Sequence, residues 1–178
     1  MSTELKASSL DFGAVVAFIA PGFIAMHAVA FHSPQAQSWL DLTAKSDQAV
    51  GVFLFVLLTS LALGLVVSGI RALLLDSILS CRLIRSLAVP PLNINWKAVD
   101  DKNLPVLLTI RDNFYRYYQF YANTLVALAL WALSRAYSTA TPLSRPVCII
   151  GAACMIALLL SARLSLKRYV DSVTKLFS

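Results

Sequence analysis

The sequence predicts an all-α, polytopic membrane protein with four transmembrane helices and helical cytoplasmic extensions of the second, third and fourth spans. Three observations predict this class. Of the 178 residues, 58% are apolar and 13% are charged, against roughly 45–50% and about 25% in soluble domains, and the mean hydropathy is +0.73. Four long stretches carry no charged residue, and Lys and Arg gather on one side of them. The chain is expected to form a single membrane domain, residues 1–178.

Charged residues bound each of the four apolar stretches. The predicted spans cover residues 12–31, 48–70, 117–134 and 146–162. A helix crosses the hydrocarbon core with about 17–25 residues, so all four stretches are long enough.

The first span contains a break at Pro21-Gly22. Proline has no amide hydrogen, so the carbonyl of Ala17, four residues earlier, loses its helical hydrogen bond and the helix kinks. Such a kink serves packing in most helices, whereas in transporters it exposes backbone to a substrate or ion.

The distribution of Lys and Arg predicts the orientation, because basic residues near span ends are retained in the cytoplasm. With both termini inside, 12 of the 15 basic residues are cytoplasmic, and only Lys45, Arg135 and Arg145 lie in outer loops. We therefore expect an integral protein of the cell (inner) membrane with both termini cytoplasmic. The same asymmetry accounts for the net charge of +6, so we expect no direct binding of nucleic acid.

Residues 71–116 and 163–178 form the predicted cytoplasmic stalk. The helix of the second span is expected to continue until Pro90-Pro91, where proline stops it. A further helix is expected to start near Leu104-Pro105, with Asn103 as its cap, and to run into the third span. The C-terminal segment is amphipathic. It either packs on the stalk, which we favour, or lies flat among lipid headgroups.

Small residues repeat at intervals of four along the second span. They are Ser60, Gly64, Ser68 and Ala72. Such a stripe lets helix backbones approach closely. Two interpretations stay open: packing inside one four-helix bundle, or contact between the subunits of a homo-oligomer, which we expect to exist.

A stripe of polar residues descends from the cytoplasmic end into the third span. It consists of Asp112, Arg116, Gln119 and Asn123. Polar groups at membrane depth should face protein rather than lipid, so the stripe is predicted to be a helix seam or the lining of a pore. It ranks first among the candidate functional sites. If the protein is a scaffold, the stripe is buried between helices and Asn123→Leu is expected to be tolerated. If the protein is a channel, the stripe lines the pore and the same change is expected to abolish ion flux.

Basic residues of the stalk form a second candidate site, for a protein partner or for lipid. They are Arg71, Arg82, Arg85, Lys167 and Arg168. At about 100° per residue the first three lie within roughly 60° on one helix face. Such a face can hold an acidic partner or anionic lipid, and salt should weaken the contact.

The sequence contains no recognisable catalytic or metal-binding set. His27 and His32 lie five residues apart without a nearby carboxylate or thiol, unlike the usual metal-ligand spacings. Asp100 and Asp101 are adjacent and have no third polar partner at a fixed offset, as in a solvated loop. We expect no enzymatic activity, no cofactor and no metal.

The layout of four short spans, a basic cytoplasmic stalk and no catalytic set resembles that of small membrane subunits of bacterial defence and toxin systems. The leading hypothesis is a non-enzymatic, oligomeric inner-membrane protein whose stalk recruits or senses a soluble partner. The alternative is a small channel or pore-forming effector. No charged residue lies in the core of any predicted span, which counts against ion-coupled transport.

Cysteine labelling tests the predicted topology. In a background without Cys81, Cys148 and Cys154, the variant Lys97→Cys should react with a membrane-impermeant maleimide only after the cells are opened, because residues 72–115 are predicted to be cytoplasmic. A cysteine within residues 32–47 should react in intact cells. Labelling at position 97 in intact cells would overturn the orientation.

Overall fold

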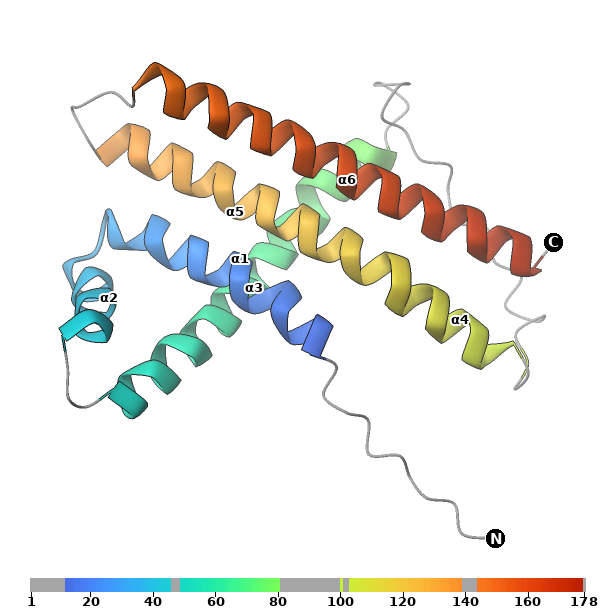
Figure 1. Cartoon of the computed structure of the whole chain (residues 1–178), viewed down its shortest axis with the longest axis horizontal. Helices are drawn as coiled ribbons and strands as arrows, with labels where there is room; N and C mark the ends of the chain where they lie inside the picture. Colours follow the sequence, from blue (N-terminus) through green and yellow to red (C-terminus); the bar gives the residue numbers. More distant parts are fainter. Residues whose placement is uncertain (1–11, 46–48, 81–99, 101–102, 139–143, 178) are drawn as a thin grey trace, which may run out of the picture.

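The computed structural model describes residues 12–45, 49–80, 100, 103–138 and 144–177, and over these residues the chain is helical and contains no strand (Figure 1). The elements are α1 (Phe12–Ala30), α2 (Pro34–Lys45), α3 (Ala49–Ser80), α4 (Leu104–Ile110), the π-helical turn η2 (Arg111–Tyr115), α5 (Arg116–Ser138) and α6 (Arg145–Phe177). The predicted all-α class is confirmed.

Two helices are long and apolar enough to cross a membrane. They are Val50–Ser77, within α3, and Arg145–Phe177, which is α6. Large apolar side chains are exposed along both helices, as lipid contact would require; on α3 they include Phe53, Leu58 and Leu65, and on α6 Ile149, Ile156 and Leu160. Both helices support the prediction of a membrane protein. The spans expected in α1 and α5 remain predictions.

The long helices alternate in direction along the chain. Figure 1 shows α1, α5 and α6 side by side, with α3 crossing behind them on a diagonal, and α4 continuing into α5 through η2. In Figure 1, α1 runs from near the middle of the view to the left, where α2 lies, and α6 runs from the left to the right, so α1 and α6 have opposite directions. An even number of membrane crossings would produce this arrangement.

Two glycines set the crossing of α1 and α3. A Cβ atom added to Gly22 would lie 1.7 Å from the Ser60 carbonyl oxygen, and one added to Gly64 would lie 2.1 Å from the Phe18 carbonyl oxygen. Backbone therefore packs on backbone at this crossing, with no room for a side chain. Two residues of the small-residue stripe, Ser60 and Gly64, therefore contact α1 of the same chain. Ala72, at the end of the stripe, is exposed.

Two apolar clusters join the helices. The first contains Ala25, Val67, Val126 and Ala127, from α1, α3 and α5. The second contains Tyr118, Ala122 and Ala162, from α5 and α6, with Leu75 of α3 and Leu166 of α6 packed against it.

The C-terminal half of α6 packs on neighbouring helices. It contacts α4 and η2, and Val170 and Val173 are buried. Of the two placements considered for this segment, packing on the helices that precede α5 is the one the structure has. The prediction that a helix begins at Leu104-Pro105 is confirmed. The side chain of Asn103 makes no capping hydrogen bond there; instead its backbone amide donates to Oδ1 of Asp100 at 2.9 Å.

The helix α2 is absent from the sequence-based expectation, which treated residues 32–47 as a loop. Ser33 and Pro34 supply its start, because the Ser33 hydroxyl accepts a hydrogen bond from the Ala36 amide at 3.4 Å, and proline favours the first helical turn. The Trp39 ring packs edge-on against Phe55 of α3, with ring centroids 4.9 Å apart. The predicted helix stop at Pro90-Pro91 lies outside the described residues.

The glycine crossing predicts a sharp difference between two substitutions in α3. Gly64→Ala should lower the free energy of unfolding by about 1–3 kcal/mol, because the added methyl group overlaps the α1 backbone, and Gly22→Ala should act similarly. Gly69→Ala is the matched control, since a Cβ at Gly69 meets nothing within 4 Å. Thermal unfolding in mild detergent measures all three, and equal midpoints for Gly64→Ala and Gly69→Ala would contradict the crossing.

Candidate functional site

Charged and aromatic side chains meet where α3, η2, α5 and α6 come together. We call this group the polar junction, and it consists of Arg71, Asp76, Tyr115, Tyr118 and Tyr169. Three helices and the π-helical turn contribute to it. It lies beside the apolar cluster formed by Tyr118, Ala122 and Ala162, so its side chains are placed by helix packing.

An ion pair forms the centre of the polar junction. The Arg71 side chain is 5% exposed, and its Nη1 donates to Oδ1 of Asp76 at 3.1 Å. The hydroxyl of Tyr118, a residue that is 1% exposed, donates to the same carboxylate oxygen. The Arg71 guanidinium carbon also lies 5.1 Å from the centroid of the Tyr118 ring. One carboxylate therefore balances a buried cation and holds Tyr118 in place.

The two charges of this pair differ in exposure, since the Asp76 side chain is 36% exposed and the Arg71 side chain only 5%. Solvent at the carboxylate screens part of the attraction, but removal of Asp76 would leave the buried Arg71 guanidinium without its counter-charge, at a cost of about 1–3 kcal/mol. The pair thus ties α3 to α5 through Tyr118. The Nε of Arg71 has no hydrogen-bond partner among the described residues, so the junction does not satisfy the whole guanidinium.

Three tyrosines connect this pair to α6. The ring centroid of Tyr115 lies 5.8 Å from that of Tyr118 and 5.2 Å from that of Tyr169. Tyr115 belongs to η2, where the Arg116 amide donates to the carbonyl of Arg111, five residues earlier. The wider turn shifts the side chains of η2 around the helix axis, and such turns often occur at functional sites.

The structure separates the basic residues that the sequence grouped together. Arg71 is buried and paired with Asp76, so it does not belong to an exposed basic face, and this correction removes it as a contact for a soluble partner. Lys167 and Arg168 are exposed on α6, as expected. Arg82 and Arg85 lie outside the described residues.

The polar stripe, which begins in η2 and continues along α5, also divides into two parts. At its start, Oδ1 of Asp112 lies 3.1 Å from Nη2 of Arg116 and 3.1 Å from Nη2 of Arg111, forming a partly exposed ion-pair group. Gln119 is half-buried. Asn123 is fully buried, and its Nδ2 donates to the Ala17 carbonyl oxygen at 3.2 Å. The deepest residue of the stripe therefore faces protein, as the sequence analysis expects of a polar group at that position.

The bond between Asn123 and Ala17 repairs the break at Pro21. Proline at position 21 cannot donate to the Ala17 carbonyl, and the amide of Asn123 supplies a donor from the neighbouring helix. This hydrogen bond counts against the expectation that a scaffold tolerates Asn123→Leu. That substitution would leave a buried carbonyl without this donor, which costs about 1–3 kcal/mol.

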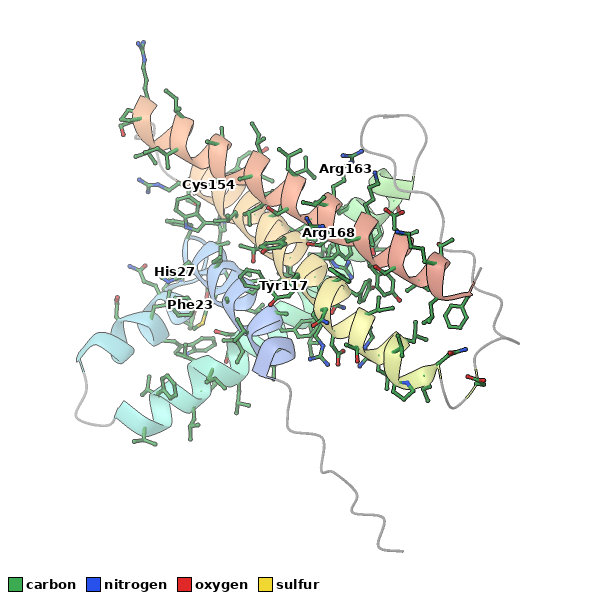
Figure 2. All side chains as sticks on the ribbon, turned by 45° about the vertical axis from the view of Figure 1, so that its right-hand side comes forward. Phe23, His27, Tyr117, Cys154, Arg163 and Arg168 are labelled. Atoms are coloured by element: carbon green, nitrogen blue, oxygen red, sulfur yellow. The ribbon has the colours of Figure 1, made fainter. Side chains whose placement is uncertain are left out.

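The two histidines lie near the other end of α1. Figure 2 shows His27 beside Phe23, and their ring centroids are 4.9 Å apart in an edge-on contact. His32 lies within 3.3 Å of the Ser138 hydroxyl. Within the described part of the chain, no three His, Cys, Asp or Glu side chains come together as a metal site would require. The side chains of Cys148 and Cys154 are exposed on α6.

Sequence reasoning missed Asp76 and Tyr118. Asp76 is the single acidic residue between Asp47 and Asp100, and it follows Arg71 by five residues within an apolar helix. An isolated charge of each sign in such a helix was the available signal for a buried pair. Tyr118 carried no such signal, because it lies among several tyrosines that a membrane interface alone would explain.

Comparisons of this chain with protein-family models, with curated proteins and with solved structures give no match.

The burial of Arg71 predicts a measurable effect of one mild substitution. Asp76→Asn should lower the free energy of unfolding by about 1–3 kcal/mol, because the buried Arg71 keeps its charge and loses its counter-charge. The double variant Arg71→Met/Asp76→Leu should recover part of this loss. Asp112→Asn is the control: its carboxylate is as exposed as that of Asp76, at 36%, but its partners Arg111 and Arg116 are more exposed than Arg71, so its ion pairs should contribute only about 0–1 kcal/mol. Unfolding in mild detergent measures the series, and equal losses for Asp76→Asn and Asp112→Asn would contradict the role of the buried arginine.

Proposed function

We propose that this chain is a non-enzymatic, oligomeric protein of the cell (inner) membrane whose basic cytoplasmic extension recruits or senses a soluble partner. In this proposal α1, α3, α5 and α6 each cross the bilayer. Both termini lie in the cytoplasm. The ends of α3 and α6, together with α4 and η2, form the cytoplasmic body.

The packing of the end of α6 is the observation that carries the proposal. Val170 and Val173 are buried, and Tyr169 contacts Tyr115, so the helices beyond the apolar segments form one packed unit. A packed unit presents side chains in a fixed arrangement, which lowers the entropic cost of binding a partner. The positive charge of Arg168, which is exposed, suits an acidic surface.

The direction of the helices supports the proposed topology. Because α1 and α6 run in opposite directions, the start of α1 points toward the end of the structure where α6 finishes (Figure 1), which fits four crossings with both termini on one side. The excess of Lys and Arg in the segments at that end supports its assignment to the cytoplasm.

A small channel is the second candidate. Two observations favour it: the buried Oδ1 of Asn123 and the buried Oγ of Ser60 have no hydrogen-bond partner among the described residues, and water could supply one. The bond from Asn123 to Ala17 favours the scaffold, because it gives this side chain a structural role. Ion flux through the purified protein in liposomes, lost on Gln119→Leu, would reverse this ranking.

Charge reversal in the stalk tests the proposed partner. Arg82→Glu/Arg85→Glu should insert normally but lose the soluble protein that accompanies the wild-type chain when it is purified from native membranes at low salt. We expect recovery of that protein to fall about tenfold or more, and moderate salt should have the same effect on the wild type.

Arg145→Gln, at the predicted outer end of α6, is the control and should retain the partner. Equal recovery with the reversed and control variants would contradict the proposal, as would the absence of any soluble protein with the wild type. Native mass spectrometry of the same preparation showing only a monomer would contradict its oligomeric part.

A further inference from the structure

We propose that one face of α6 binds the phosphate headgroup of an anionic phospholipid through Arg163 and Lys167, with the acyl chains along the apolar side chains that precede them. The inference rests on the proposed membrane topology and goes beyond it by assigning a ligand class to particular residues. It also separates lipid contact from partner contact among the basic residues of the chain.

Four residues of α6 share this face, which we call the lipid face: Ile156, Leu160, Arg163 and Lys167. At about 100° per residue they lie within a sector of roughly 60°. Ile156 is 59% exposed and Leu160 is 53% exposed, so the part that precedes the cations is apolar and open. The same face therefore changes from apolar to cationic along the helix, in the order in which a phospholipid presents its chains and its phosphate.

The depth of these residues matches one leaflet of a bilayer. At about 1.5 Å per residue, Arg163 lies roughly 10 Å along α6 from Ile156. Half of the hydrocarbon core measures about 15 Å. When the acyl chains of a lipid contact Ile156 and Leu160, its phosphate lies at the level of Arg163 and Lys167. These two residues follow directly after the predicted span, which ends at residue 162.

The charge of Arg163 lacks the compensation that Arg71 has. Both arginines have a buried Nε without a hydrogen-bond partner among the described residues. Arg71 has Asp76 as its counter-charge, whereas the structure pairs Arg163 with no carboxylate of the described residues. A partly buried cation without a counter-charge is stabilised by an external anion, and the basic end of a membrane helix is a favourable place for an anionic headgroup.

Other charges near the lipid face do not block it. Asp171 lies one turn beyond Lys167, farther along α6 from the apolar residues, and the structure shows no ion pair between these two described residues. Arg168 belongs to another side of α6, about 100° from Lys167, and Figure 2 shows Arg163 and Arg168 leaving α6 on different sides. Arg168 therefore remains available to a soluble partner and serves as a control.

Lipid fits this face better than an acidic protein does. A soluble protein can reach the cations beyond the span, but it cannot cover Ile156 and Leu160 inside the hydrocarbon region. A lipid satisfies both parts at once. The phosphate accepts hydrogen bonds from the guanidinium and the ammonium group, while its chains contact the exposed apolar side chains.

Retention of lipid by the purified, full-length protein tests the proposal. The protein is held in detergent and titrated with phosphatidylglycerol or phosphatidylcholine, and native mass spectrometry counts the bound lipids. We expect a preference for phosphatidylglycerol. In Arg163→Gln/Lys167→Gln its affinity should fall about 25-fold, since each basic side chain near a headgroup contributes about fivefold.

Two further variants keep the test specific. Arg145→Gln/Arg168→Gln removes the same charge elsewhere on α6 and should bind within about twofold of the wild type. Arg163→Lys/Lys167→Arg keeps both charges and should retain the preference, so a loss caused by misfolding is recognised. Free glycerol phosphate, which has the headgroup and no chains, should displace little lipid.

Several results would overturn the proposal. Equal binding of phosphatidylglycerol by Arg163→Gln/Lys167→Gln and the wild type would do so, and so would an equal loss in the charge-matched control, which would indicate net charge alone. Displacement by glycerol phosphate would indicate a site for free anions. Loss of a co-purifying protein without loss of lipid would indicate a protein contact. Failure of the wild type to insert into vesicles would contradict the proposed function itself.

Discussion

The close crossing of α1 and α3 is the contact on which the rest of the structure depends. At Gly22 and Gly64 the backbone of each helix lies against the other, and an added Cβ would overlap it. Close backbone packing of this kind brings helices into extensive van der Waals contact. With α1 held against α3, α5 packs against both through Val126 and Ala127, and the amide of Asn123 reaches the Ala17 carbonyl that Pro21 leaves without its helical partner.

A second constraint acts farther along α3, where the buried charge of Arg71 has to be balanced. Asp76 neutralises Arg71 and accepts a hydrogen bond from the Tyr118 hydroxyl. The chain itself therefore supplies the counter-charge of the buried arginine and the hydrogen-bond acceptor of the buried tyrosine. Tyr115 extends this group to Tyr169 of α6. The end of α6 is thereby attached to η2 and α4, and the exposed cations of α6 are held on a packed surface.

Separate roles for the basic residues follow from their surroundings. Arg71 is buried and paired within the chain, Arg163 and Lys167 continue an exposed apolar face of α6, and Arg168 projects from another side of that helix. Sequence spacing alone grouped Arg71 with residues of the stalk, because a helical wheel describes the angular position of a residue and not which neighbouring helix covers it. The proposed partner and lipid sites therefore draw on different side chains, which allows them to be tested independently.

The sequence by itself determined the helical class, two segments long and apolar enough to cross a membrane, and the main helix boundaries, because long apolar runs, prolines and flanking charges act locally along the chain. It also indicated that Asn123, the deepest residue of the polar stripe, would face protein. Only the tertiary structure decided that Gly64 serves a contact within the chain, that Asp76 and Tyr118 enclose Arg71, and that Asn123 bonds to Ala17. Each of these contacts joins residues from different helices, except for the link of Arg71 to Asp76, and local sequence patterns contain no information about which helix faces meet.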